Sequence, residues 1–127
     1  MNKYLIIFTI IVASSFANAS MTTGTYIGIN TDSGKDCKIE IYDDGDYLKS
    51  GKSIYRLTEH RKGPFIECDD YEGNIYDKCA SGDHINGNKQ KSIYMLISEN
   101  NDIQKVYFQN EVSESVNDYI CVDFQKI

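Results

Sequence analysis

Hydrophobic and polar residues alternate along short segments of the chain. In the segment CKIEIY, which begins at Cys37, apolar residues occupy nearly every second position. The same spacing places Ile120, Val122 and Phe124 on one face of the last expected strand. A period of two residues is typical of a strand with one buried face, and no segment keeps a 3.6-residue period over three helical turns. The pattern therefore predicts an all-β protein.

The expected strands are separated by turns rich in Gly, Asn and Asp. Their predicted ranges are 25–29, 37–42, 47–48, 53–59, 65–70, 75–78, 93–98, 103–109 and 119–126. The Gly- and Asn-rich stretch 80–90 is expected to be the least ordered. About eight strands in sequential hairpins favour a small antiparallel meander that forms a closed or nearly closed barrel, with a β-sandwich as the alternative.

The N-terminal residues have the three parts of a secretory signal. Lys3 is followed by an apolar run, Tyr4–Ala13, and by the small-residue triplet Ala17–Ala19. We therefore predict a cleaved signal peptide over residues 1–19 and a single β domain over 20–127. The apolar run is shorter than the roughly 20 residues of a membrane-spanning helix. The mature protein is thus expected to be secreted or periplasmic, with no membrane span.

Four cysteines, an even number in a short exported chain, predict two disulfides. A two-residue hairpin loop at Gly73–Asn74 would place Cys68 opposite Cys79. The pairing predicted from this hairpin is Cys68–Cys79, which leaves Cys37–Cys121 to join an early strand to the last one. The spacings contain no C-x-x-C pair, which argues against a zinc site.

The charge balance points to a class of partner. The whole chain has a formal net charge of −6, and the predicted signal carries one lysine and no acid, so the remainder carries −7 (−6 minus +1). This acidity disfavours nucleic acid as a partner and favours a basic protein. The ten tyrosines are consistent with a protein-binding surface, since tyrosine is enriched at interface hot spots.

The sequence contains few residues suited to catalysis. His60 and His84 are the only histidines, and no G-x-S-x-G motif is present. We therefore expect a non-enzymatic protein, and the alternative of a small secreted hydrolase would depend on one of these histidines.

No cofactor or bound metal is expected. The one acidic turn that could be tested for calcium contains Asp43, Asp44 and Asp46, although it lacks the ligand pattern of an EF-hand loop.

Two short resemblances bear on function. Gly24–Gly28 resembles the entry strand of calycin-type barrels, which implies a small-molecule-binding barrel as an alternative function. Cys79–Gly82 resembles the start of the inhibitory loop of bacterial periplasmic C-type lysozyme inhibitors, which are small β-barrels. The tyrosine that follows this motif at a short spacing in that family is not present here.

These observations together predict a secreted or periplasmic binding protein. Its most concrete form is an inhibitor or immunity-type protein that occludes a cationic enzyme, such as a lysozyme or an antibacterial toxin. One candidate contact surface is the acidic turn at 43–46. The other is the stretch 80–90, in which the candidate contact residues are Ser81, Asp83, His84, Asn86, Asn88 and Lys89.

Overall fold

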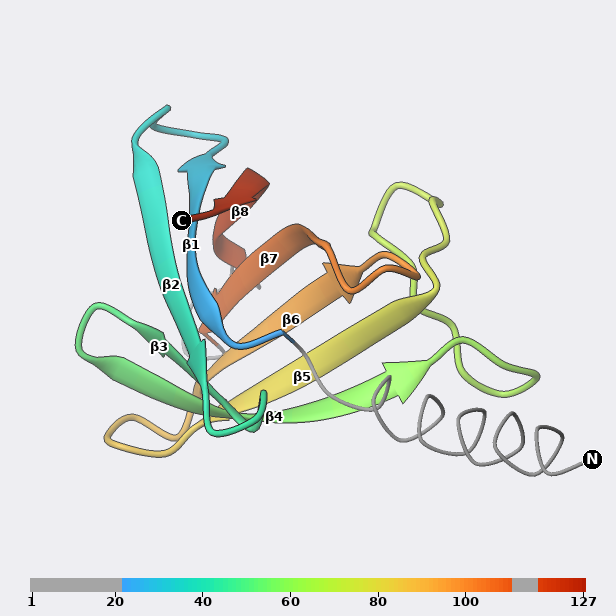
Figure 1. Ribbon diagram of the computed structural model, residues 1–127, viewed down its shortest axis with the longest axis horizontal. Coiled ribbons are helices and arrows are strands. Elements are labelled where there is room, and N and C mark those ends of the chain that lie inside the picture. Colours follow the sequence, from blue (N-terminus) through green and yellow to red (C-terminus); the bar gives the residue numbers. More distant parts are fainter. Residues whose placement is uncertain (1–21, 111–116) are drawn as a thin grey trace, which may run out of the picture.

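The computed structural model describes residues 22–110 and 117–127, which form a closed antiparallel barrel (Figure 1). Its strands are β1 (Gly24–Asn30), β2 (Asp36–Tyr42), β3 (Tyr47–Ser50), β4 (Ser53–Arg61), β5 (Lys78–His84), β6 (Lys91–Ile97), β7 (Ile103–Asn110) and β8 (Asn117–Lys126). Each strand pairs with the next, and β1 also pairs with β8. The predicted eight-stranded meander and its closure are confirmed.

The predicted signal peptide, residues 1–19, lies outside the described residues. Within the described ranges, no helix has the length and apolar character needed to cross a membrane.

The barrel interior is filled by side chains from all eight strands. Ile39, Ile41 and Leu48 have no exposed surface, so no water-sized space lies beside them. The buried members of this core are Tyr26, Cys37, Ile39, Ile41, Leu48, Tyr55, Leu57, Ala80, Ile93, Met95, Ile97, Ile103, Val106, Phe108 and Cys121. A barrel of eight strands is narrow enough for its own side chains to fill it.

The face expected for the last strand is wrong. Phe124 packs against the barrel interior, as Cys121 does, whereas Ile120 packs against a separate cluster outside the barrel. The reason is a bulge in β8 at Asp123, where φ is 56°. An extra residue in one strand moves every later side chain to the opposite face, so strict alternation cannot predict this change.

A glycine in β1 makes room for the β8 bulge. The register between the strands shifts between Ile27 and Ile29, on either side of Gly28. A Cβ atom at Gly28 would lie 2.7 Å from the Phe124 ring and 2.8 Å from the Val122 carbonyl oxygen. Only glycine allows this close approach.

The expectation of disorder at 80–90 is wrong for its first part, since Lys78–His84 forms β5. This strand contains no β-branched or large aromatic residue, so its composition is not typical of a strand. It forms because β4 and β6 pair with it on both sides. Ala80 and Gly82 point inward, and a Cβ at Gly82 would lie 2.4 Å from Ile93.

The hairpin predicted around Gly73–Asn74 is also wrong. Residues 65–70 and 75–77 belong to a long β4–β5 loop, 62–77, with only two isolated bridges. In this loop the Tyr76 amide donates to the Cys68 carbonyl oxygen at 2.6 Å, and Cys79 pairs with His60 of β4 instead. The loop leaves the right-hand end of the barrel in Figure 1.

Both predicted disulfides are confirmed. Cys37–Cys121 lies in the barrel interior and links β2 to β8, the two neighbours of β1, across a Cα–Cα distance of 6.3 Å. Cys68–Cys79 ties the long loop to β5, with a Cα–Cα distance of 5.4 Å.

Candidate functional site

The long loop 62–77 packs against an apolar patch on the outer wall of the barrel. The buried centre of this patch consists of the Cys68–Cys79 bridge, Leu96 and Tyr107. Tyr76, Tyr94 and Ile120 surround it and are partly buried. The loop therefore covers part of the outer face of β5 to β8, whose inner face lines the barrel core.

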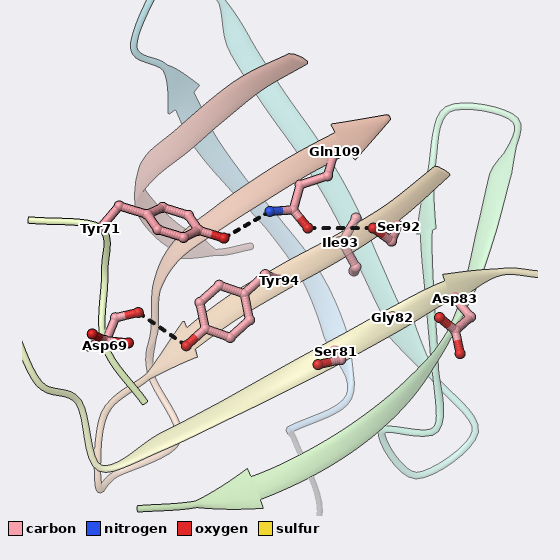
Figure 2. A pocket seen from close by; sticks show the side chains of 9 residues that line it. All are labelled: Asp69, Tyr71, Ser81, Gly82, Asp83, Ser92, Ile93, Tyr94 and Gln109. Carbon is pink, nitrogen blue, oxygen red and sulfur yellow. Dashed lines mark hydrogen bonds between the residues drawn. The ribbon is translucent and has the colours of Figure 1, made fainter. Parts of the chain in front are cut away.

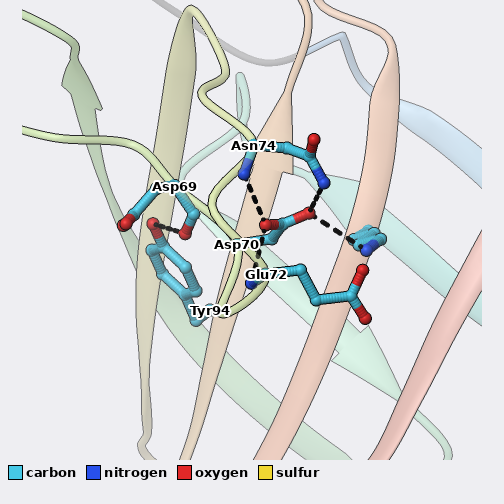
Figure 3. A network of polar contacts seen from close by, with 6 residues as sticks. Asp69, Asp70, Glu72, Asn74 and Tyr94 are labelled. Atoms are coloured by element: carbon cyan, nitrogen blue, oxygen red, sulfur yellow. Dashed lines mark hydrogen bonds and ion pairs between the residues drawn. The ribbon is translucent and has the colours of Figure 1, made fainter.

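A buried carboxylate anchors the loop (Figure 3). Asp70 is 1% exposed and accepts hydrogen bonds from the backbone amides of Glu72 and Asn74, each at 2.9 Å. The Asn74 side-chain amide donates to it at 2.8 Å, and the Lys105 ammonium lies 3.2 Å away. The Asn74 side chain first, then the two backbone amides and Lys105, hold the pKa of Asp70 well below its usual range, although burial opposes this shift.

Three tyrosine rings lie where the loop meets the sheet. Tyr71 makes an edge-on contact with Tyr107 (centroids 5.1 Å apart) and a tilted contact with Tyr94 (6.4 Å). The Gln109 amide donates to the Tyr71 hydroxyl at 3.0 Å, and the Tyr94 hydroxyl donates to the Asp69 carbonyl oxygen at 3.1 Å. These contacts attach the middle of the loop to β6 and β7.

An open cleft of about 420 Å³ lies beside these rings, between the loop and the outer face of β5 and β6 (Figure 2). The loop supplies Asp69 and Tyr71, and the strands supply serines, Asp83 and Tyr94. Its lining residues are Asp69, Tyr71, Ser81, Gly82, Asp83, Ser92, Ile93, Tyr94 and Gln109. This lining combines two carboxylates with two aromatic rings and contains no basic residue.

The loop also exposes apolar side chains. Gly63 and Ile66 exchange backbone hydrogen bonds at 2.9 and 3.4 Å, which closes a tight turn with Phe65 at its corner. Phe65 is 98% exposed, and Ile66 and Ile75, which line a second, shallow cleft within the loop, are 43% and 56% exposed. We call Phe65, Ile66 and Ile75 the apolar tip.

The loop that carries the apolar tip is acidic. Residues 62–77 contain five acidic residues and one basic residue, Lys62. Lys62 forms an ion pair with Asp77 at 3.2 Å, where the two ends of the loop meet. Asp70 is paired with Lys105, so Glu67, Asp69 and Glu72 remain as acids for which the described structure contains no ion pair.

The structure divides the contact residues predicted at 80–90 into two groups. Ser81 and Asp83 lie on β5 and line the cleft. His84 ends the strand, and Asn86, Asn88 and Lys89 lie in the β5–β6 connection, at the opposite end of β5 from loop 62–77 (Figure 1).

Hydrogen bonds within the fold involve both asparagines of the β5–β6 connection. The Asn86 side chain accepts from the Ile54 amide at 2.9 Å and donates to the Lys52 carbonyl oxygen at 2.7 Å. The Asn88 carbonyl oxygen lies 2.8 Å from His84 Nδ1. This connection is therefore braced against the β3–β4 turn.

The acidic turn joins β2 to β3. Asp43 and Asp44 adopt positive φ angles of 52° and 57°, and the Asp46 amide donates to the Asp43 carbonyl oxygen at 3.1 Å. Among the described residues, no three His, Cys, Asp or Glu side chains are grouped so that they could hold a metal ion. Asp43, Asp44 and Asp46 therefore lie close in sequence without forming a cage of ligands.

Neither histidine is arranged as a catalytic base in the described structure. The His84 ring packs against Tyr55, with centroids 5.3 Å apart, and its only hydrogen-bond contact is with a backbone carbonyl. No carboxylate or hydroxyl within the described ranges makes a hydrogen bond to the ring of His60 or His84. The general-base geometry that the hydrolase alternative requires is not present in these residues.

The apolar tip was missed by sequence reasoning because Phe65 and Ile66 are typical strand residues. Gly63 and Pro64 directly before them are turn formers, and this was the available signal. Comparison of the chain with models of known protein families, with curated proteins and with solved structures found no match.

Proposed function

We propose that this chain is a secreted or periplasmic, non-enzymatic binding protein that engages a basic protein partner through loop 62–77. The observation that carries this proposal is Phe65, a large aromatic side chain held almost entirely in solvent. Exposed apolar groups that form a patch with a polar rim are typical of protein interaction sites.

The loop that carries Phe65 is attached firmly to the barrel. The Cys68–Cys79 bridge, the Asp70 network and the Tyr71 contacts attach it to the barrel at three places. A preordered loop loses less conformational entropy when it binds, so more of the contact energy appears as affinity. An aromatic anchor surrounded by polar groups is also the usual composition of an interface hot spot.

Charge selects the class of partner. Loop 62–77 contains five acidic residues and one basic residue, and the whole chain is acidic. Such a surface attracts basic proteins and repels acidic ones. A projecting loop suits a concave site, so the most concrete form of the proposal is an inhibitor or immunity-type protein that occludes a cationic enzyme, such as a lysozyme or an antibacterial toxin.

The filled barrel interior gives no support to the alternative of a calycin-like carrier, since the central side chains have no space beside them. The two disulfides are compatible with an oxidising compartment, as the predicted signal peptide requires.

The test is binding and inhibition of a panel of basic muramidases, amidases and nucleases by the mature protein. With the partner found, Phe65→Ala should weaken binding by about 2 kcal/mol or more, since it removes a central aromatic anchor. Ile85→Ala is the matched control, because Ile85 is an exposed apolar residue of the β5–β6 connection. Titration calorimetry measures both.

Failure to bind any member of the panel, even at low salt, would overturn the proposal. An equal loss for Ile85→Ala and Phe65→Ala would show that the loop is not the binding surface.

A further inference from the structure

We propose that the cleft between loop 62–77 and strands β5 and β6 binds an arginine side chain of the basic partner. This inference rests on the proposed function and identifies the group that the partner would insert. It uses the cleft, whereas the proposed function depends on the apolar tip.

The cleft is lined by two carboxylates. Asp69 and Asp83 both line the cleft, and Figure 2 shows them on either side of Ser81. None of the cleft-lining residues is basic, and in the described structure neither carboxylate forms an ion pair. The cleft therefore carries two carboxylates that take part in no ion pair within the described residues.

The nearest basic residue by strand register is Arg56 of β4, which pairs with Asp83. Its guanidinium carbon lies 5.9 Å from the centre of the Tyr47 ring, so the group is directed to an aromatic partner on β3. Asp83 thus remains available to a cation from outside.

Two aromatic rings also line the cleft. The rings of Tyr71 and Tyr94 lie 6.4 Å apart at an angle of 52°, and both belong to its lining. A tyrosine phenol is neutral at physiological pH, and burial first, then the negative charge of Asp69, raise the pKa of Tyr94 further. A planar guanidinium stacks on neutral tyrosine rings and also forms paired hydrogen bonds with a carboxylate.

The cleft also offers hydrogen-bond acceptors. Ser81 and Ser92 place hydroxyl groups on the floor of the cleft, and Ser92 donates to the Gln109 side-chain oxygen at 3.4 Å. A guanidinium has five N–H donors in a fixed plane, and it needs several acceptors around it when it leaves water. Carboxylates, hydroxyls and ring faces together meet this need, whereas the compact ammonium of lysine would not use the ring faces as fully.

The experiment is a titration of the folded protein, at low ionic strength, with acetyl-L-arginine amide, followed by amide chemical shifts in NMR. Acetyl-L-citrulline amide is the matched uncharged probe. We expect saturable shifts centred on Ser81, Ser92 and Tyr94, with affinity for the citrulline probe at least about tenfold lower. High salt should weaken binding of the arginine probe, because screening reduces the attraction between exposed charges.

Substitutions assign the site. Asp69→Asn and Asp83→Asn should each lower the affinity for the arginine probe by about tenfold. Asp32→Asn, the same change in the exposed β1–β2 turn, should leave its affinity unchanged. The same spectra show whether each variant is folded.

Equal binding of both probes, shifts that lie away from the cleft, or tighter binding of an N-acetylglucosamine trimer at the same residues would overturn the inference. The last result would make the cleft a carbohydrate site. Phe65→Ala should weaken binding of the protein partner but not binding of the arginine probe. If a basic partner binds through Phe65 while the probe does not bind, the inference fails and the proposed function stands.

Discussion

Asp70 shows how a single buried side chain can hold a long surface loop in place. Its carboxylate is shielded from solvent, yet three N–H groups and one ammonium contact its two oxygens. A buried charge is tolerated only when its hydrogen-bonding capacity is met in this way. The sequence could not reveal this role, because Asp69 and Asp70 are adjacent acids and nothing local distinguishes the buried one from its neighbour.

The lowered pKa of Asp70 predicts a dependence of stability on pH. A carboxylate with a depressed folded-state pKa contributes stability that is fully present above its unfolded pKa, about 3.9. This contribution is lost as the pH falls below that value toward the folded-state pKa. We therefore expect the urea midpoint to fall more between pH 5 and pH 3 for the native chain than for Asp70→Asn.

The control for this prediction is Asp32→Asn, which removes an exposed carboxylate and should keep the native pH dependence. If the Asp70→Asn protein loses as much stability on acidification as the native chain, Asp70 is not the group responsible.

Among the elements, β5 and loop 62–77 differ most from what their local sequences predict. The loop has a strand-like sequence, and the strand has a loop-like one. Phe65 and Ile66 favour a strand but lie in the loop, whereas the small residues around Ala80 form a strand between two neighbours. Strand preference depends on packing and pairing, so context overrides composition. The apolar run in β6, by contrast, does indicate a strand that is covered on both faces.

The contact between β1 and β8 supplies a prediction for a pair of elements. Gly28→Ala should lower the free energy of unfolding by about 1–3 kcal/mol, because the new methyl group would collide with the Phe124 ring and with backbone of β8. Chemical denaturation measures this change.

Gly63→Ala is the matched control, since a Cβ there meets no atom within 4 Å and φ is not positive. Its effect should stay within about 0.5 kcal/mol. Equal losses for the two variants would mean that the bulge contact is not what requires glycine at position 28.

For the molecule as a whole, alternation and sequential hairpins favoured a closed or nearly closed barrel over a sandwich, and the structure is a closed barrel. The Cys68–Cys79 pair was predicted correctly from a hairpin that does not form. The observed loop brings the same two cysteines together in a different way. The candidate site was only partly predictable. Ser81 and Asp83 were named from sequence, but the cleft also needs Asp69 and Tyr71, and their place depends on how the loop folds over the sheet.

The two disulfides should contribute unequally to the stability of the whole chain. Cys37–Cys121 spans 84 residues, and Cys68–Cys79 spans 11. By loop-closure entropy, replacing both members of the long bridge with alanine should cost about 4–5 kcal/mol, against about 3 for the short one. Urea unfolding of the two double variants provides the comparison, and a greater loss for the short bridge would contradict it.

The pairing of β1 with β8 has a consequence for the order in which the chain folds. During synthesis the N-terminal strands are made first, so β1 can pair with β2 early. The other edge of β1 stays unpaired until β8 has been made. Contacts between segments so distant in sequence are slow to form, since a long loop must close first. The barrel thus cannot be completed on a partly emerged chain.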